Sequence, residues 1–468
     1  MTPDDPRRNL PATYEILLAY RAAGGSFEDA VMIPLIRREI SIARVNPSPH
    51  DARASISERI VSSLLALERP RLSRVINGTG VIIHTNLGRA PVSPETARVM
   101  ALAASSAVSL ELDLAANQRG GRMREIEELI FALTGAESAL LVNNNASAVL
   151  LALSAIAFRK DVIVSRGESV EIGGGFRVPD VLSQSGARMI DIGTTNRTYA
   201  ADYAREINAE TAAMLKVHPS NFSMTGFVHD ASIEELATLA KAKGIVLIDD
   251  LGSGALIDPS QFGVHGERTV RQSLEAGADL VCFSTDKLLG GPQGGIVAGR
   301  KPLIERISRH PLARAVRADK VALAGLAETL RHYARGEAVT KVPVWRMIAA
   351  TTEQLQFRSR AIREALPEVS LEEIVVESTI GGGAAPGQAL PSIALSPGVR
   401  LAAETESMAK RFRLASPALA TRIADQRLLI DLRTILPEDN DALIEILRLH
   451  APSKTAASSE IPGVENPG

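Results

Sequence analysis

Cysteine is nearly absent from this sequence, which contains 1 in 468 residues. A single cysteine excludes an intramolecular disulfide framework and a cysteine-based zinc cluster. Long hydrophobic runs are absent as well: no stretch of about 18 apolar residues occurs, so we expect no membrane-spanning helix. Neither sign of charge is in excess, because the net charge is only −2. Composition therefore does not indicate nucleic-acid binding, and an RNA partner would require a local basic patch.

Familiar nucleotide and metal motifs are also missing. The sequence has no Gly-Lys dipeptide and hence no Walker A loop, no dinucleotide fingerprint after a predicted strand, and no His-Glu-x-x-His. The first residues, "MTPDDPRRNLPATYE", begin acidic and lack an apolar core, so they do not resemble a secretory signal. The composition, with 45% hydrophobic and 23% charged residues, is that of a globular protein, which we expect to be cytoplasmic.

The pattern of apolar residues changes along the chain. Near the start, Ile56, Ile60 and Leu64 recur at helical spacing, and the end is small, polar and proline-containing. We expect four segments: a helical domain at 1–70, a catalytic core at 71–330, a smaller α+β domain at 331–450 and a disordered tail at 451–468.

The N-terminal segment is mildly basic. Up to Arg74 it holds 11 arginines, no lysine and 9 acidic residues. Two interpretations stay open on these residues alone: a helical bundle with solvated arginines, or an arm that binds a polyanion.

The core alternates short apolar runs with helix-like stretches. The runs are "SALLVN", "DVIVS", "ARMIDI", "AAMLKV", "GIVLIDD", "ADLVCFS" and "GGIVAG". Such alternation predicts an α/β fold with a mostly parallel sheet covered by helices on both faces. Ligands of such sheets bind at the carboxyl ends of the strands, where "DDLGSG" and "STDK" fall.

Lys287 stands out in "VCFSTDKLLGGPQGG", because the chain has only 10 lysines against 42 arginines. A lysine at the end of a buried strand loses solvation, which lowers its pKa and suits a Schiff base with an aldehyde cofactor. Ser284, three residues earlier, would reach the cofactor phosphate. The glycines allow close backbone approach. The alternative is a surface lysine in a loop, but the context favours pyridoxal 5'-phosphate.

Two further features fit this cofactor. Asp250 ends "GIVLIDD", where a carboxylate can pair with the pyridine nitrogen; Asp249 is its rival, although its side chain should point to the opposite face. The strand-to-helix turn "VNNNASAVLLAL" offers Asn145, Ala146 and Ser147 as a phosphate cup at a helix start. A structural cap explains either feature as well. The order of cup, aspartate and lysine is that of the aspartate-aminotransferase-like fold.

Arginines and paired hydroxyls supply candidate anion contacts. Arginine forks suit phosphate-like oxyanions, although each could instead be a surface residue. The candidates are Arg89, Arg119, Arg122, Arg314 and Arg317, with Thr194 and Thr195 in the loop "DIGTTNRT". The histidines His84 and His218 follow apolar runs, and their roles stay open.

Several long motifs together resemble one family. They include "INGTGVIIHTNLGRAPVS", "LTGAESALLVNNNASAVLLAL", "KVHPSNF", "DLGSGAL", "FSTDKLLGGPQGGIVAGR" and "HPLARAVRADK". In this order they resemble bacterial selenocysteine synthase, the L-seryl-tRNA(Sec) selenium transferase family, over nearly the whole chain. The resemblance implies a fold-type-I pyridoxal phosphate enzyme. It would convert seryl-tRNA(Sec) to selenocysteinyl-tRNA(Sec) through an aminoacrylyl-tRNA, using selenophosphate.

The resemblance also implies roles for single residues. Lys287 becomes the Schiff-base lysine, and Asp286 an acid or positioning group at the substrate. Arg89, Arg122 and Arg314 resemble the arginines around the selenium-donor anion. The N-terminal domain would bind tRNA, and the homo-oligomer would be a homodecamer, a pentamer of dimers with sites at subunit interfaces.

Four positions depart from the family pattern, and one of them is Gly295 in "PQGG", where alanine or cysteine is more usual. Thr285 replaces the usual glycine before the Asp-Lys pair, and Pro219 and Ser223 stand where polar or basic residues are common. These departures leave the substrate contacts less defined than the cofactor chemistry. Two alternatives stay open: a related pyridoxal phosphate lyase for a small amino acid or amino sugar, and a non-catalytic tRNA-binding scaffold.

Overall fold

The computed structural model describes residues 10–45, 53–68, 72–172, 175–398 and 402–454. It divides the chain into two compact units, Met1–Arg74 and Val75–Gly468, which we call the N-terminal unit and the large unit. Most of the tail expected to be disordered, from residue 455 onward, lies outside the described residues. Its first residues are ordered by pairing: the N–H of Lys454 donates to the Glu368 carbonyl at 2.9 Å.

The N-terminal unit is helical, as predicted. Its three helices are α1 (Thr13–Ala22), α2 (Asp29–Val45) and α3 (Arg53–Leu65). Apolar residues at helical spacing pack against one another in its core, among them Tyr20, Met32, Ile36, Ile60 and Leu64.

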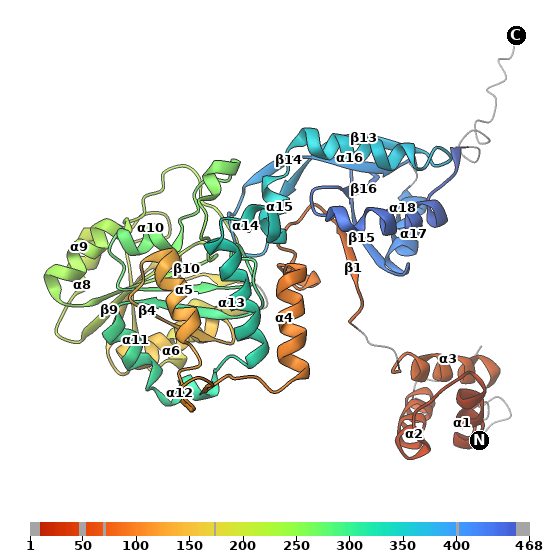
Figure 1. Ribbon diagram of the computed structural model, residues 1–468, viewed down its shortest axis with the longest axis horizontal. Coiled ribbons are helices and arrows are strands. Elements are labelled where there is room, and N and C mark those ends of the chain that lie inside the picture. Colours follow the sequence, from red (N-terminus) through yellow and green to blue (C-terminus); the bar gives the residue numbers. More distant parts are fainter. Residues whose placement is uncertain (1–9, 46–52, 69–71, 173–174, 399–401, 455–468) are drawn as a thin grey trace, which may run out of the picture. The chain divides into compact units, whose positions relative to one another are not determined.

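A seven-stranded sheet forms the centre of the large unit (Figure 1). All seven apolar runs of the sequence are its strands: β4 (Ser138–Val142), β5 (Asp161–Ser165), β8 (Arg188–Ile192), β9 (Thr211–Val217), β10 (Val246–Gly252), β11 (Leu280–Ser284) and β12 (Gly295–Gly299). Their order is β4-β12-β11-β10-β9-β5-β8. The prediction of a mostly parallel sheet is confirmed, since β8, β5, β9, β10 and β11 pair in parallel.

Strand β12 is the exception, because it runs antiparallel to both β11 and β4. Only residues 285–294 join it to β11, and they form no helix. A parallel pairing needs a crossover connection of a dozen residues or more, so this short loop returns the chain as an antiparallel neighbour. The same loop carries Lys287.

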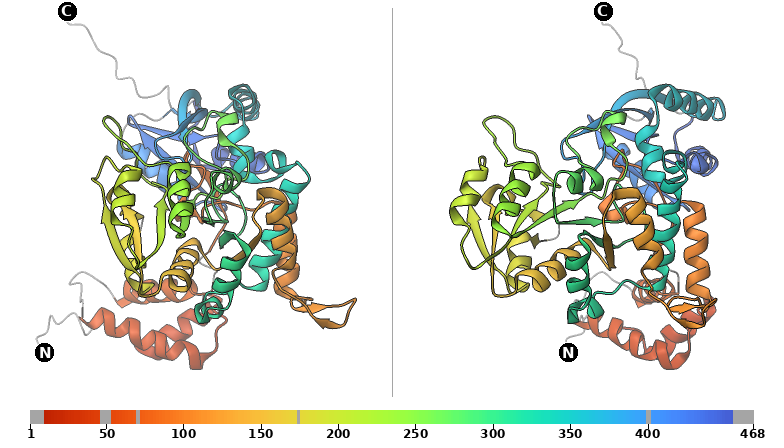
Figure 2. Two further views of the ribbon diagram at one scale, coloured as in Figure 1. Left: turned by 90° about the vertical axis from the view of Figure 1, so that its left-hand side faces the viewer. Right: turned by 60° about the vertical axis from the view of Figure 1, so that its left-hand side comes forward.

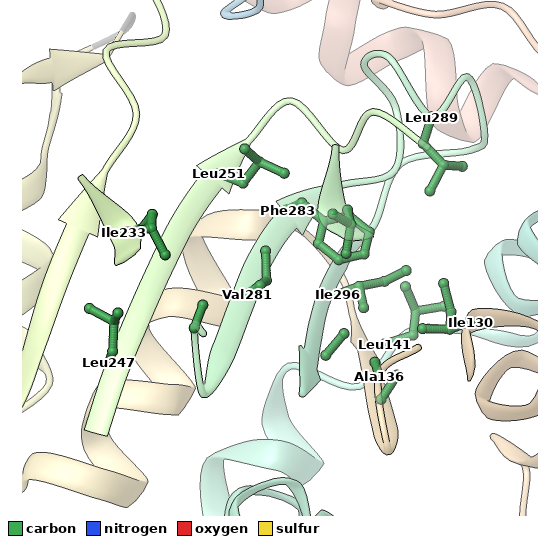
Figure 3. Close-up of a cluster of buried hydrophobic side chains, with 14 of the residues drawn as sticks. Ile130, Ala136, Leu141, Ile233, Leu247, Leu251, Val281, Phe283, Leu289 and Ile296 are labelled. Atoms are coloured by element: carbon green, nitrogen blue, oxygen red, sulfur yellow. The ribbon is translucent and has the colours of Figure 1, made fainter. Parts of the chain in front are cut away.

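Helices cover both faces of this sheet (Figure 2). One face packs against α5 (Arg124–Thr134), α8 (Ala200–Glu206), α9 (Ile233–Lys243), α10 (Val270–Glu275) and α13 (Lys320–Ala334). The other packs against α6 (Asn145–Ala157), α7 (Val178–Gln184) and α11 (Lys301–Ser308). Figure 3 shows Leu247 and Leu251 of β10 with Val281 and Phe283 of β11 in the first core. Alternate residues therefore serve opposite faces, as the pleat requires.

A second sheet, drawn mainly in blue in Figure 1, forms the C-terminal part of the large unit. Its order is β1-β15-β16-β14-β13. The strands are β1 (Val75–Gly78), β13 (Leu371–Thr379), β14 (Ala389–Pro397), β15 (Ala418–Ala424) and β16 (Arg427–Asp431), and the helices packed on them are α16 (Thr352–Glu364), α17 (Ala402–Arg413) and α18 (Asn440–His450). The first strand after the N-terminal unit thus joins the C-terminal sheet.

Shorter elements complete the large unit. They are α4 (Pro94–Ser105), α12 (Pro311–Ala315), α14 (Ala338–Lys341), α15 (Pro343–Ala349), the ribbon strands β2 (Leu112–Asp113), β3 (Gln118–Arg119), β6 (Glu171–Ile172) and β7 (Phe176–Arg177), and the 3-10 turns η2 (Thr85–Leu87), η3 (Arg166–Glu168), η4 (Pro259–Phe262) and η5 (Pro437–Asp439). Helices α15 and α16 are separate, because Thr351 caps α16 and its side chain accepts from the N–H of Gln354.

A buried serine and a buried histidine, with a partly exposed glutamate, join α4 to α13. Ser93 Oγ lies 2.9 Å from Nε2 of His332, whose Nδ1 lies 2.7 Å from Glu337. The serine hydroxyl also caps α4 by accepting from the N–H of Thr96 at 3.0 Å. Ser93 is 1% exposed, so this arrangement holds two helices together and offers no nucleophile to a ligand. Among the residues described, no helix is both long and apolar enough to cross a membrane.

Candidate active site

Lys287 lies just beyond β11, at the end of the sheet where the parallel strands terminate. The residue is only 7% exposed, and its Nζ donates a hydrogen bond to the carbonyl of Gly383 at 3.1 Å. Burial and the positive charge of Arg89 lower the pKa of Lys287, while nearby carboxylates act in the opposite direction. A larger fraction of this amine is therefore neutral and nucleophilic at a given pH than in an exposed lysine.

Glycines keep the space around this amine open. A Cβ atom would lie 3.9 Å from Nζ at Gly252 and 2.9 Å from it at Gly383. Both residues have positive φ, 71° and 81°, which side chains other than glycine rarely tolerate. Gly254 lets the chain that follows β10 approach the end of β11, because its Cβ would lie 2.4 Å from the Ser284 carbonyl oxygen.

Asp250 is the second buried charge at this end of the sheet, near the end of β10. Its Oδ1 accepts a hydrogen bond from Nδ2 of Asn145 at 2.8 Å. Burial raises the pKa of Asp250 to about 6, against the opposing effects of the Asn145 hydrogen bond and the Lys287 charge. A carboxylate in such surroundings is stabilised when a cation is placed beside it.

Asp249 faces away from this group. Its carboxylate oxygens each lie 3.3 Å from Nη2 of Arg268. Successive residues of a strand point to opposite faces, so only one aspartate of the pair can be directed at Asn145.

The amino end of α6 supplies backbone donors beside this carboxylate. Asn144 caps the helix, and its Oδ1 accepts from the N–H of Ser147 at 2.9 Å. Because Asn145 uses its side chain on the aspartate, it offers its backbone N–H to a ligand, as does Ala146. Gly295 makes room, since a Cβ there would lie 2.2 Å from the Asn144 carbonyl oxygen. Donors at a helix start suit an anion such as phosphate.

Ser284 is placed next to this cup by the register of the sheet. It is the last residue of β11, is 4% exposed, and pairs with Gly295 of β12. Gly295 in turn lies against Asn144. The cup, Ser284, Asp250 and Lys287 therefore come from neighbouring strand ends.

Arg89 belongs to the same group. Its Nη1 pairs with Oδ2 of Asp286 at 2.8 Å. Arg89 has a φ of 63°, and the next N–H, of Ala90, donates to the Asp286 carbonyl at 3.2 Å. The turn after η2 is thus bound to the residue that precedes Lys287. The arginine side chain is 37% exposed, so it can also reach a bound molecule.

The other candidate arginines form a second group around Glu111. Arg122 and Arg317 lie 3.8 and 3.6 Å from its Oε1, and Arg119 lies 2.9 Å from its other oxygen. Burial and the charges of Arg317 and Arg314 lower the pKa of Arg122. An isolated pairing of Arg317 with Val142, at the end of β4, places this group beside the strand that leads to the cup.

Thr194 and Thr195 lie in the loop after β8. The Thr194 hydroxyl donates to the Arg197 carbonyl at 3.0 Å and so closes its own turn. Thr195 lines a cavity of about 130 Å³ together with Glu168 and Pro219. This cavity lies at the ends of β5, β8 and β9, and neither threonine contacts Lys287.

Sequence reasoning missed a carboxylate and a loop that complete the site. Glu267 is buried, and its Oε1 accepts from the N–H of Ala385 and lies 2.8 Å from Nε2 of His218. Gly383 and Ala385 belong to "IGGGAAPG", between β13 and β14. The three successive glycines were the signal in the sequence that could have revealed this loop. No local pattern indicated that Glu267 belongs to the site or that it would contact His218.

The residues present fit pyridoxal phosphate. A buried lysine, a buried carboxylate and a helix start meet at one end of the sheet. Three buried polar atoms beside them have no hydrogen-bond partner among the described residues: Asn145 Oδ1, Ser220 Oγ and Asp286 Oδ1. Such atoms cost free energy unless a ligand or water satisfies them, which favours a polar molecule in this place.

Comparison with known proteins identifies close relatives. A family model described as L-seryl-tRNA selenium transferase matches residues 75–436. The L-seryl-tRNA(Sec) selenium transferase of Carboxydothermus hydrogenoformans is 44% identical over 417 residues, with 88% of each chain covered. That of Geobacter sulfurreducens is 46% identical over 383 residues, covering 81% of this chain and 83% of its own. That of Moorella thermoacetica is 40% identical over 457 residues, covering 94% and 96%.

A solved structure shows the same fold. D-glucosaminate-6-phosphate ammonia-lyase superposes with a TM-score of 0.59 and 23% identity, covering 83% of this chain and 97% of its own. At that identity the likeness concerns the arrangement of the helices and strands.

Proposed function

The chain belongs to the L-seryl-tRNA selenium transferase family, and from this premise we propose that it converts L-seryl-tRNA(Sec) to L-selenocysteinyl-tRNA(Sec) with pyridoxal phosphate as cofactor. The observation that carries the proposal is the family match over residues 75–436. Within that stretch, a buried lysine, a buried aspartate and a helix start lie at adjacent strand ends. These are the parts that the cofactor chemistry requires.

The cofactor, when bound, supplies an electron sink for the bonds of the seryl group. Lys287 would hold it covalently, and Asp250 would keep its ring nitrogen protonated. The backbone of Asn145 and Ala146, with the hydroxyls of Ser147 and Ser284, would bind its phosphate.

Lys287 is also the proposed base. Once the α-amine of the serine replaces it, the Lys287 amine is free and close to the substrate. Its lowered pKa increases the neutral fraction, which can take the Cα proton. The β-hydroxyl would then leave as water. Selenium of the donor would add to Cβ, its phosphorus–selenium bond would break with transfer of the phosphoryl group to water as phosphate, and Lys287 would return the proton to Cα.

Asp286 is proposed to position that hydroxyl. Its Oδ2 pairs with Arg89 at 2.8 Å, while its buried Oδ1 has no partner among the described residues. The free oxygen can accept a hydrogen bond from the serine hydroxyl, and a water supplies the proton for its departure.

Selenophosphate is proposed as the selenium donor, because arginine forks suit its oxyanion. Arg89 would contact it beside Lys287. Arg122 belongs to the group around Glu111, and the charge of Arg314 acts on Arg122. We propose that both arginines act across a subunit interface in a homodecamer, a pentamer of dimers. Thr194 and Thr195 are proposed to contact the tRNA-borne substrate.

The helical domain that the sequence predicts at residues 1–70 is proposed to bind the tRNA. Up to Arg74 the chain has no lysine and its arginines slightly outnumber its acidic residues, and arginine side chains bind the phosphates of a polyanion. A tRNA substrate also supports a cytoplasmic location.

The test is selenium transfer by the purified full-length chain. Labelled selenium from selenophosphate should appear on seryl-tRNA(Sec), and Lys287→Ala should abolish it. Arg309→Ala is the control and should leave transfer unchanged, because Arg309 is an exposed arginine just after α11 whose only ion pair among the described residues is with Glu305. If a small amino acid or amino sugar reacts and seryl-tRNA(Sec) does not, the chain is a lyase of this fold instead.

A further inference from the structure

A glycine loop from the C-terminal part of the large unit closes against Lys287. It follows β13 and reads "IGGGAAPG", residues 380–387. The Gly383 carbonyl accepts from Nζ of Lys287 at 3.1 Å, and the N–H of Ala385 donates to Glu267. Beyond it, Gln388 Oε1 accepts from the N–H of His265 at 3.2 Å. On the N-terminal side of the loop, the N–H of Ile83 donates to the Ile380 carbonyl at 2.8 Å. Hydrogen bonds therefore hold the loop on both sides of the lysine contact.

The loop has a backbone that only glycine adopts easily. Gly381, Gly382 and Gly383 have φ of 75°, 51° and 81°. A Cβ at Gly382 would lie 2.4 Å from the Ile83 carbonyl oxygen. The loop thus presents backbone, and no side chain, to the amine.

Glu267 anchors this backbone from the other side. Its side chain is fully buried, with 0% exposed. Burial alone would raise its pKa, but His218 and the N–H of Ala385 outweigh this effect and lower it. The anchor is therefore a charged acceptor that holds Ala385, two residues from the carbonyl that meets Lys287.

The proposed reaction frees the Lys287 amine in a buried place. A buried donor without a partner has lost its hydrogen bonds to water and gained none in return, which is unfavourable. Water cannot easily replace that partner next to a residue that is 7% exposed. An acceptor built into the protein would remove this cost.

We propose, on the basis of the function given above, that the Gly383 carbonyl holds the Lys287 amine while it is free, and that Glu267 is the positioning residue that fixes this carbonyl through Ala385. One N–H of the neutral amine donates to the carbonyl, so its lone pair is left for the substrate. In the step that follows, the Cα–H bond breaks, an N–H bond forms at Nζ, and the electron pair passes to the cofactor ring.

The first test titrates Lys287 in the cofactor-free, full-length protein. Reductive methylation with formaldehyde, read by mass spectrometry from about pH 6 to about pH 10, reports the neutral amine. Gly383→Ala places a Cβ 2.9 Å from Nζ, and loss of the hydrogen bond should lower the midpoint by about one pH unit. Gly244→Ala is the matched control, with a φ of 69° and nothing within 4 Å of the added Cβ. It should leave the midpoint unchanged.

The second test separates position from charge. Arg89, Asp250, Asp286 and Glu267 all act on the Lys287 charge, so Glu267→Ala and Glu267→Gln are compared with each other. Both remove the charge, but glutamine keeps an acceptor for the Ala385 N–H. Glutamine should retain slow hydrogen exchange in residues 381–387 and a higher Lys287 midpoint than alanine. This pair decides the matter even if Gly383→Ala fails to fold.

The loaded enzyme gives a third readout. With α-deuterated seryl-tRNA(Sec), Gly383→Ala should lower kcat about tenfold or more, raise the isotope effect and leave KM unchanged. The proposal is overturned if Gly383→Ala titrates like Gly244→Ala, or if the two Glu267 variants behave alike. If the wild type transfers no selenium while the midpoints still shift, the proposed function fails and the lysine–carbonyl pairing stands.

Discussion

Replacing Asp250 by asparagine should stabilise the cofactor-free protein while inactivating the enzyme. Asparagine has nearly the same shape, and its Oδ1 can still accept the hydrogen bond from Asn145, which is 2.8 Å long. It carries no charge to bury. The carboxylate is unfavourable in the empty site and becomes favourable only beside a protonated ring nitrogen.

The size of the gain follows from the pKa of Asp250. Burial raises it from the ordinary value of 3.8 to about 6. A carboxyl whose pKa is raised on folding binds protons more tightly in the folded state, so the stability of the wild type falls as the pH rises from about 4 to about 6. The asparagine variant should be more stable by about 3 kcal/mol at pH 8 and by only about half of that at pH 5.

The assay is unfolding of the cofactor-free protein at these two pH values, together with selenium transfer by the loaded enzyme. Transfer should fall by about a hundredfold or more, because a preorganised charge is lost at the reacting centre. Asp249→Asn is the control, because Asp249 is a buried carboxylate that pairs with the partly exposed Arg268, and loss of that pairing should destabilise the protein instead. If both variants lower the stability of the cofactor-free protein equally, the Asp250 carboxylate is not destabilising in the absence of a cation, and the reasoning is refuted.

Three further outcomes follow from the site. Asn145→Ala removes the donor to Asp250, and the affinity for pyridoxamine phosphate in a spectroscopic titration should fall about tenfold or more. Arg89→Lys keeps a charge beside Asp286 but loses the fork, so KM for the selenium donor should rise about tenfold with unchanged cofactor binding. Gly295→Ala places a Cβ 2.2 Å from a carbonyl oxygen of the cup, and calorimetry should show a loss of about 1–3 kcal/mol in stability with weaker cofactor binding.

The sheet was predictable because its signal is local. Each of the seven apolar runs became a strand of one sheet, and the alternation with helices implied the parallel pairing. The direction of β12 was not stated in advance, although the short connection from β11 requires it. The division between α15 and α16 depends on the cap at Thr351, which a periodicity search overlooks.

The site divides in the same way. Recognisable strands end close to Lys287, Asp250 and the start of α6. These strand ends lie at the same edge of the sheet because the strands run in the same direction. Glu267 and Gly383 come from loops about a hundred residues apart, so only tertiary packing brings them together. From the sequence, the arginines could be grouped only by their chemical type. In the structure they are separated, because Arg89 pairs with Asp286 and Arg122 pairs with Glu111.

The most direct measurement of the central claim is the absorbance spectrum of the purified, cofactor-loaded protein before and after seryl-tRNA(Sec) is added. The account predicts a band from the cofactor held by Lys287, which shifts with seryl-tRNA(Sec) and not with free serine. A band that responds only to a small amine would indicate a lyase. No band in the presence of added cofactor would contradict the account, because Lys287 would then be a structural residue.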